Sequence, residues 1–235
     1  MKIKLILLSL VLSLTSVGAI ALPAAFNATY SVSKSGLTLG EMKSSLSYNG
    51  TTYKYHKKSI STGLVSWLSG DKVSENADGK FNGNYLQSVN YLYHHTSKRK
   101  NRKDQLKFIS PREVKGVYKS NAYNLKVPNG SLDRATLELA LARDLAANKK
   151  VLKYSIVERG HRKDYLLQRQ GTEKLTIKNK QYNAEKLIVV RKGTTRKTTF
   201  WLAKELDYMP VKINHVEKGD AIVTELKSFK FLKEE

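Results

Sequence analysis

The sequence predicts an all-β protein with one main helix: a curved antiparallel sheet, as a half-open barrel or a sandwich, with a helix at about residues 133–147 packed against it. Apolar and polar residues alternate with period two through most of the chain, as in strands with one buried and one wet face. Short turns containing Gly or Asn separate these segments at even spacing. With 235 residues, 40% of them hydrophobic, and no cysteine, the chain can bury a core without disulfides.

The first 21 residues have the order of a cleavable signal peptide. Lys2 and Lys4 precede a mostly apolar run from Leu5 to Ile20, and a small-residue site ends at Ala21. A membrane anchor is the alternative, because about 18 apolar residues can span a bilayer. Serines and threonines dilute the run and Pro23 follows it. We therefore expect cleavage after Ala21, a periplasmic location, and a single β-rich domain over residues 22–235 with no integral membrane segment.

The charge is strongly positive. Lysine and arginine number 42 against 20 aspartates and glutamates, a formal charge of +22. Loss of Lys2 and Lys4 with the signal peptide leaves 40 cations and 20 anions, or +20. Because export separates the protein from nucleic acid, we expect no nucleic-acid partner. The expected partners are an anionic lipid, lipopolysaccharide or another acidic envelope component.

Turn signals predict four hairpins. Asn49-Gly50 stands between two alternating segments and predicts a type I′ turn, in which both central residues have positive φ. Asp78-Gly79 and Asn82-Gly83 precede an aromatic strand and indicate a second hairpin. Two further hairpins are expected to turn at residues 192–194 and 219–220.

One segment breaks the alternation and predicts the helix. Leu137, Leu141 and Leu145 are spaced four apart in a stretch rich in Ala, Arg and Glu. Asp133 is expected to cap its first turn. The helix could link two β domains or plug one continuous sheet, and the lack of a Pro-, Gly- or Ser-rich linker favours the plug. A short helical turn is also expected at residues 63–68.

Three segments carry a family resemblance: Val127-Pro128-Asn129-Gly130-Ser131-Leu132-Asp133, Thr199-Phe200-Trp201-Leu202-Ala203 and Met209-Pro210-Val211-Lys212-Ile213. They resemble the family called domain of unknown function 3108, secreted proteins of Gram-negative bacteria. The segments 26–30, 36–42 and 61–68 follow the family's order too. The resemblance implies a periplasmic all-β domain with a helix against a curved sheet, and it implies no catalytic residue, cofactor or substrate.

Motifs for catalysis or metal binding are absent from the sequence. No Gly-x-Ser-x-Gly elbow occurs, and the five histidines stand in separate segments apart from His94-His95. Neighbouring residues of a strand point to opposite faces, so this pair is not expected to hold one ion. We therefore expect no enzyme activity, no metal and no cofactor.

Two sets of residues are candidates for binding. The first is a basic block at a predicted hairpin tip, and an exposed turn that keeps strand edges apart is its alternative explanation. This candidate anion site comprises Lys98, Arg99, Lys100, Arg102 and Lys103. The second is an aromatic lining of the concave face that could hold an apolar ligand, with ordinary core packing as the alternative. This candidate ligand pocket comprises Trp67, Tyr85, Tyr91, Tyr93 and Trp201.

Alternation places Phe200 and Trp201 on opposite faces of one strand. Because Phe200 and Leu202 share the more apolar face, we expect Phe200 in the deep core and Trp201 opposite, under the helix or beside a cleft.

Two non-enzymatic functions fit these observations. The first is a periplasmic binding protein that holds an anionic amphiphile or lipid in the curved sheet. A packed sheet interior without a cavity of about 300 Å³ or more would exclude this lipid-binding function. The second is an envelope scaffold whose basic surface docks an acidic protein or glycan.

Overall fold

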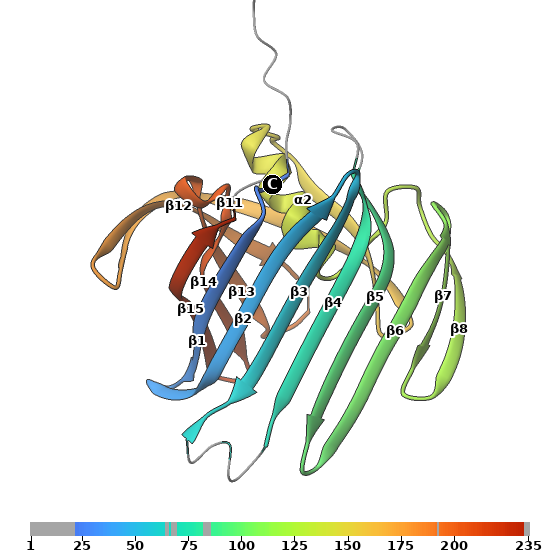
Figure 1. Cartoon of the computed structure of the whole chain (residues 1–235), viewed down its shortest axis with the longest axis horizontal. Coiled ribbons are helices and arrows are strands. Elements are labelled where there is room, and N and C mark those ends of the chain that lie inside the picture. The colour runs from blue at the N-terminus through green and yellow to red at the C-terminus, as the bar shows by residue number, and fades with distance from the viewer. Residues whose placement is uncertain (1–21, 64–65, 67–69, 82–85, 192, 233–235) are drawn as a thin grey trace, which may run out of the picture.

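The computed structural model describes residues 22–63, 66, 70–81, 86–191 and 193–232. In these residues a 15-stranded sheet accompanies one α-helix and one 3-10 helix (Figure 1). The elements are β1 (Phe26–Lys34), β2 (Leu37–Asn49), β3 (Thr52–Ser61), β4 (Lys72–Phe81), β5 (Leu86–Ser97), β6 (Lys100–Ser110), β7 (Glu113–Tyr118), β8 (Asn121–Lys126), β9 (Leu132–Asp133), α2 (Thr136–Ala146), β10 (Leu152–Glu158), β11 (His161–Ile177), β12 (Lys180–Val190), β13 (Lys197–Ala203), η1 (Lys204–Leu206), β14 (Met209–Glu217) and β15 (Asp220–Phe231).

The sheet is a meander that curls on itself. Its order runs from β8 back to β1, then from β15 back to β9, because the first and last strands pair with each other. All neighbours are antiparallel except the short pair of β9 and β10. In Figure 1 strands β1–β6 form the front wall, β11–β14 lie behind them, and α2 lies between the two walls. The predicted curved antiparallel sheet is confirmed, and its form is the half-open barrel.

The predicted hairpins form, but two of their turns differ from expectation. Asn49 pairs with Thr52, so the first turn is centred on Gly50 and Thr51, and of these two only Gly50 has positive φ. The expected type I′ turn is therefore wrong, because that turn needs positive φ at both central residues. Asp78-Gly79 lies within β4 at a shift of register.

Gly79 is required there for close approach, not for a turn. A Cβ at this position would lie 2.0 Å from the carbonyl oxygen of Gln87 and 2.5 Å from the Tyr53 hydroxyl. Only glycine fits such an approach.

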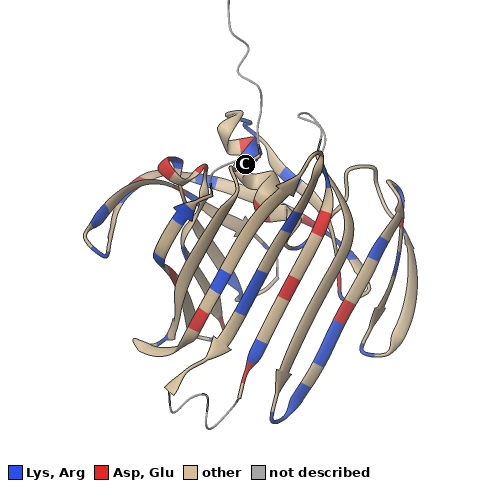
Figure 2. Cartoon of the chain, in the orientation of Figure 1, with Lys and Arg blue, Asp and Glu red and all other residues tan. Residues whose placement is uncertain are grey.

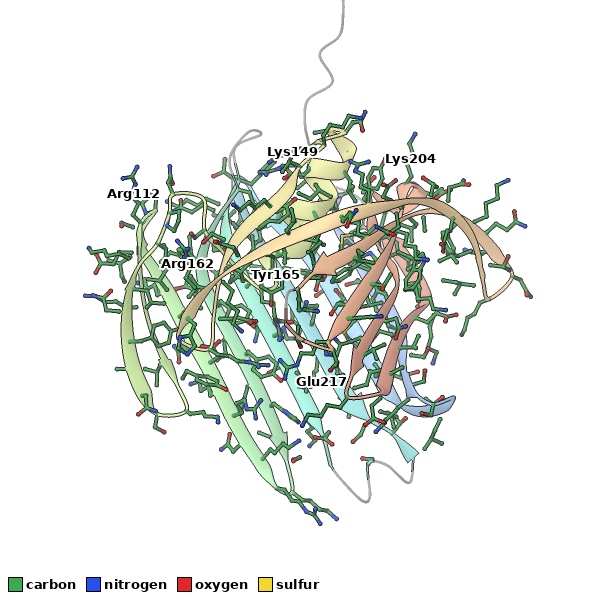
Figure 3. The ribbon with its side chains drawn as sticks, turned by 180° about the vertical axis from the view of Figure 1, so that it is seen from behind. Arg112, Lys149, Arg162, Tyr165, Lys204 and Glu217 are labelled. Carbon is green, nitrogen blue, oxygen red and sulfur yellow. The ribbon has the colours of Figure 1, made fainter. Side chains whose placement is uncertain are left out.

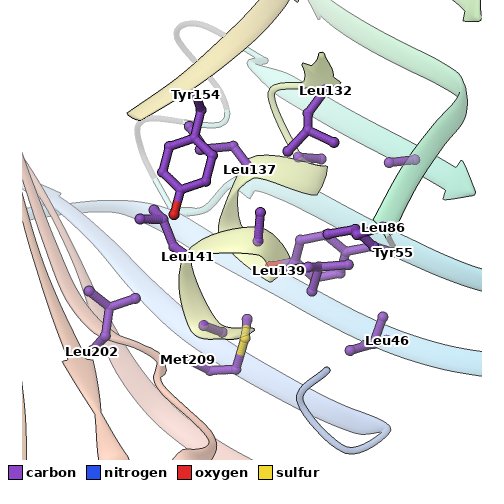
Figure 4. Packing of buried hydrophobic residues seen from close by; sticks show 14 of the residues in the cluster. Leu46, Tyr55, Leu86, Leu132, Leu137, Leu139, Leu141, Tyr154, Leu202 and Met209 are labelled. Atoms are coloured by element: carbon purple, nitrogen blue, oxygen red, sulfur yellow. The ribbon is translucent and has the colours of Figure 1, made fainter. Parts of the chain in front are cut away.

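The helix begins later than predicted and is buried on nearly all sides. It starts at Thr136, and Asp133 Oδ1 accepts hydrogen bonds from the backbone N–H of Ala135 and Thr136 at 2.9 and 2.8 Å. Asp133 therefore caps the helix as expected. Not only the predicted leucine face but also Leu139 and Ala140 are buried (Figure 4). The helix is thus a plug inside the curved sheet, as the absence of a linker predicted.

Several predictions fall outside the described residues. They are the signal peptide at residues 1–21, most of the turn at residues 63–68, and the pocket candidates Trp67 and Tyr85. Within the described part of the chain, no helix is long and apolar enough to cross a membrane.

Candidate functional site

The inner face of β2–β6 is arranged in levels. Paired residues lie side by side, and residues two apart on a strand face the same way, so the register defines successive levels along the barrel. The level nearest α2 consists of Leu46, Tyr55, Ala77, Tyr91 and Leu106, all buried. The middle level consists of Ser44, Lys57, Glu75, Tyr93 and Asp104. The next level consists of Met42, Ser59, Val73, His95 and Arg102, all half-buried.

The side of the middle level that contains α2 is called the helix half, and the other side the open half. At their boundary lies an ionic belt of four side chains: Lys57, Glu75, Arg134 and Glu138. Lys57 Nζ lies 2.6 Å from Glu138 Oε1 and 2.9 Å from Glu75 Oε2. Arg134 Nη2 lies 2.8 Å from Glu75 Oε1. Two cations and two anions therefore neutralise one another below the helix.

The belt is ionised despite its burial. Burial alone would raise the pKa of the Glu75 carboxyl, but the charges of Arg134 and Lys57 outweigh it and hold that pKa well below its usual range. Burial would likewise lower the pKa of Lys57, and Glu138 and Glu75 raise it instead. Lys57 is therefore a protonated structural cation, not a free amine nucleophile.

Tyrosines complete the belt from the helix half. Tyr91 donates to Glu75 Oε1 at 2.7 Å, and Tyr55 donates to Glu138 Oε2 at 2.7 Å. Burial raises the pKa of the Tyr91 phenol, and the Glu75 charge adds to that rise. These hydroxyls are committed to internal partners, so they belong to the packed interior.

A small cavity lies beside the belt, at the boundary between the two halves. It has a volume of about 70 Å³. Its lining comes from both halves and consists of Tyr30, Met42, Tyr55, Lys57, Glu138, Pro210, Ile213 and Thr224. A ligand pocket usually exceeds about 300 Å³, so this cavity is too small for an apolar tail.

Arginines gather around Tyr93 on the open side of the belt. The guanidinium of Arg134 lies 4.9 Å from the centre of the Tyr93 ring. Burial raises the pKa of the Tyr93 phenol, and the charges of Arg134, Arg159 and Arg102 act against that rise. Arg159 is placed by its own backbone, because its N–H donates to Asp104 Oδ2 at 2.7 Å.

A second group adjoins the first through Arg134. Burial raises the pKa of the Tyr165 phenol on β11, and the charge of Glu158 adds to that rise. The charges of Arg191 and Arg134 both act against it. Figure 3 shows Tyr165 on the wall opposite β3–β5, beneath the arch of β11. Arg191 Nη1 donates to Thr198 Oγ1 at 2.9 Å.

Three of these arginines lack an acidic partner within the described part of the chain. Arg102, Arg159 and Arg191 are half-buried there and form no ion pair with any described carboxylate. Acids lie near them without pairing: burial would raise the pKa of Glu158, and Lys163, Arg134 and Arg159 lower it instead. Because the planar fork of a guanidinium fits a carboxylate or a phosphate, these arginines are candidates for an anion site.

Of the predicted anion site, only Arg102 faces this interior. Lys98 and Arg99 form the β5–β6 turn, and Lys100 and Lys103 are exposed. The predicted block is thus divided. Arg102 is two residues from Asp104 and shares the inner face with it, and the other four lie at the tip or on the outer face.

The predicted pocket is divided too. Tyr91 and Tyr93 face the interior, but Trp201 pairs with Lys186 and Lys212 on the outer face. Its indole N–H donates to Glu173 Oε2 at 2.7 Å, and both lysines lie over its ring, at 5.4 and 5.8 Å. The assignment of Trp201 to the concave pocket is therefore wrong.

Phe200 lies on the inner face as expected, but it is only half-buried, whereas Leu202 is fully buried. The expected deep-core position of Phe200 is therefore wrong. Phe200 belongs to the open half, where the helix does not reach.

Metal ligands do not gather in the described residues, where no group of three or more His, Asp and Glu side chains could hold an ion. His94 and His95 turn to different partners, Asn101 and Asp71.

Fold and site together define an open β-barrel-like protein with a helix plug and charged side chains of both signs in its interior. A family model for proteins of unknown function, DUF3108, matches residues 26–227. The chain therefore belongs to the DUF3108 family.

Among solved structures, the chain is similar to a β-barrel-like protein of the domain of unknown function DUF1849 from Brucella abortus. The TM-score is 0.63 and the identity 8%, over 91% of this chain and 100% of the other. At that identity the likeness shows the fold alone. None of the curated proteins compared with the chain matches its sequence.

Proposed function

We propose that the protein is a non-enzymatic binding protein of the periplasm that holds an anionic amphiphile on the inner face of its open half. The observation that carries this proposal is the set of half-buried arginines without a described acidic partner, Arg102, Arg159 and Arg191. The anionic head would lie among them, close to the Tyr93 and Tyr165 rings.

The apolar part would lie along the same half, not beside the helix. Half-buried apolar side chains face the interior there from five strands: Val32, Met42, Val73, Phe200 and Ile213. An amphiphile needs this combination of a cationic site and an apolar lining. The cavity of about 70 Å³ beside the belt, which Met42 and Ile213 also line, is too small for the tail.

Native mass spectrometry and organic extraction of protein purified from its own periplasm test the proposal. We expect an anionic amphiphile with the wild type and its loss in the triple variant Arg102→Gln, Arg159→Gln, Arg191→Gln. The matched control removes three exposed cations elsewhere: Arg112→Gln, Lys150→Gln, Lys204→Gln. A wild type that carries no amphiphile, or a triple variant that retains it, would contradict the proposal.

The periplasmic location has its own test. N-terminal sequencing of the isolated protein should begin at Leu22 or within a few residues of it. Recovery of a chain beginning at Met1 from a membrane fraction would contradict export and cleavage.

A further inference from the structure

Six connections between strands lie at one end of the barrel. Because the strands from β8 round to β10 alternate in direction, their connections alternate between the two ends. The described residues of these connections at the end opposite α2 are 35–36, 62–63, 66, 70–71, 98–99, 119–120, 191, 193–196 and 218–219, and the β5–β6 and β7–β8 turns among them lie along the lower edge in Figure 1. The β10–β11 turn stops short of this end, since Arg159 reaches only the level of Asp104.

This end carries a band of exposed cations, the basic rim. It consists of Lys98, Arg99, Lys100, Lys119, Arg196, Lys197 and Lys218. Among the described residues in or next to the six connections, the acids are Asp71, Glu217 and Asp220. Figure 2 shows blue segments at the tips of the β5–β6 and β7–β8 hairpins. The rim therefore presents a net positive field around the mouth of the open half.

The opposite end is basic as well. The exposed cations in or next to its described connections are Arg112, Lys126, Lys149, Lys150, Lys178, Lys180 and Lys204, and the acids are Glu113, Glu205 and Asp207. Arg112, Lys149 and Lys204 lie along the edge that contains α2 (Figure 3). Each has an acid close by: Glu113 and Glu205 follow in sequence, and Asp144 lies 3.0 Å from Lys149 Nζ. This end is thus a natural control surface.

Two exposed apolar side chains lie at the same end, beside Lys34, whose ammonium pairs with Asp220 at 2.8 Å. Leu37, Lys34 and Ile222 are paired in one row across β2, β1 and β15, where β1 and β2 turn. Leu37 is 64% exposed and Ile222 is 39% exposed. Exposed leucine and isoleucine beside lysine are typical of segments that enter the interface of a bilayer.

We propose that the basic rim docks on the surface of an anionic lipid bilayer, with the mouth of the open half turned towards the membrane. Lysines and arginines bind the lipid phosphates, and Leu37 and Ile222 enter the headgroup region. Their apolar side chains favour a bilayer over a soluble glycan, which offers them no apolar partner. Docking rests on the rim alone. The purpose of docking would be to load or unload an amphiphile through the mouth of the open half, and this purpose rests on the proposed function.

Co-sedimentation of the mature protein with vesicles tests the docking. Vesicles of phosphatidylglycerol and phosphatidylcholine are compared with phosphatidylcholine alone, at low and at physiological salt. The rim variant is Arg99→Gln, Lys119→Asn, Lys218→Asn, since asparagine tolerates the positive φ of Lys119 and Lys218. The control variant is Arg112→Gln, Lys150→Gln, Lys204→Gln, which loses the same charge.

We expect the rim variant to bind anionic vesicles about 10- to 100-fold more weakly, because each basic residue near such a surface contributes roughly a fivefold factor. The control variant should change by less than about threefold. Salt should weaken the wild type. Equal losses in both variants would assign the attraction to total charge and overturn the proposal.

A second variant separates a bilayer from a soluble polyanion. Leu37→Ser with Ile222→Ser should weaken vesicle binding and leave retention on a heparin column unchanged. Unchanged vesicle binding would overturn the bilayer as partner and indicate an acidic glycan or protein. The interior variant Arg102→Gln, Arg159→Gln, Arg191→Gln should still bind vesicles, so failure of the proposed function and failure of docking are distinguishable. Circular dichroism checks that every variant is folded.

Discussion

The helix half and the open half of the interior are built on the same strands, yet their charges are treated differently. At the ionic belt, Lys57 and Arg134 each lie within 2.9 Å of a glutamate. Arg102 lies on β6, two residues before Asp104 and on the same inner face. It forms no ion pair with any described carboxylate. The difference shows that the helix segment has an electrostatic role besides packing. Glu138 of α2 and Arg134, in the turn just before α2, supply the partners of Lys57 and Glu75. Beyond the helix, Arg102, Arg159 and Arg191 form no ion pair with a described carboxylate, and under the proposed function a bound anion supplies that partner.

The largest expected effect comes from breaking the belt. Glu75→Leu leaves Arg134 buried without its partner and removes one of two acids from Lys57. Loss of one member of a buried ion pair costs about 3–5 kcal/mol. Urea unfolding should show this loss in the free energy of unfolding.

The control is an exposed pair. Asp220→Asn removes the partner of Lys34, and those side chains are 63% and 41% exposed. The cost should be at most about 1 kcal/mol. Equal costs for the two variants would mean that the belt does not stabilise the helix half.

Truncation in the two halves of β13 sharpens the comparison. Leu202 is fully buried in the helix half, so Leu202→Ala should cost about 2–5 kcal/mol. Phe200 is half-buried in the open half, and Phe200→Ala should cost clearly less than the about 3–5 kcal/mol of a fully buried phenylalanine. Both losses are measured by urea unfolding. A larger loss for Phe200→Ala than for Leu202→Ala would mean that Phe200, not Leu202, lies in the packed half.

Acid should act through the belt. The pKa of Glu75 is held below its unfolded value, so its contribution to stability is present above about pH 4.3 and is lost as the pH falls towards the folded pKa. One such group changes the free energy of unfolding by up to about 1.4 kcal/mol per pH unit. The difference between wild type and Glu75→Gln should therefore shrink between pH 6 and pH 3. A constant difference would show that Glu75 is not ionised in the native state.

The smallest effect is expected on the outer face. Trp201→Phe loses the hydrogen bond to Glu173 at a half-exposed position and should cost about 1 kcal/mol or less. Binding of a fluorescent fatty acid should be unchanged, because Trp201 does not face the interior. Reduced binding would place the ligand on the outer face instead.

Local signals predicted the fold well. Alternation gave the strands, and Asp133 caps the helix as its position suggested. Turn types were less predictable. Gly79 is required because the Tyr53 side chain of a neighbouring strand lies against it, and this contact cannot be seen in the local sequence Asp78-Gly79. Burial on all sides of α2 was also hidden, since a curled sheet surrounds the helix with residues distant in sequence.

The site could be predicted only in part. Its partners are far apart in the chain: Lys57 and Glu138 are separated by 81 residues, and Glu75 and Arg134 by 59. One signal was available, because Lys57 continues the inward alternation of Tyr53 and Tyr55. The same spacing was available on β6. Arg102 is two residues from the buried Asp104, which places it on the inner face and distinguishes it from the exposed lysines around it.

Titration with a fluorescent fatty acid and with its uncharged alcohol analogue tests the central claim most directly. The wild type should bind the acid and bind the alcohol much more weakly. The variant Arg102→Gln, Arg159→Gln, Arg191→Gln should lose at least tenfold in affinity for the acid, because hydrogen bonds to charged groups contribute about 1.5–3 kcal/mol each, while its free energy of unfolding stays close to that of the wild type. Equal affinity of wild type and variant for the acid, or equal affinity of the wild type for acid and alcohol, would contradict an anion site in the open half.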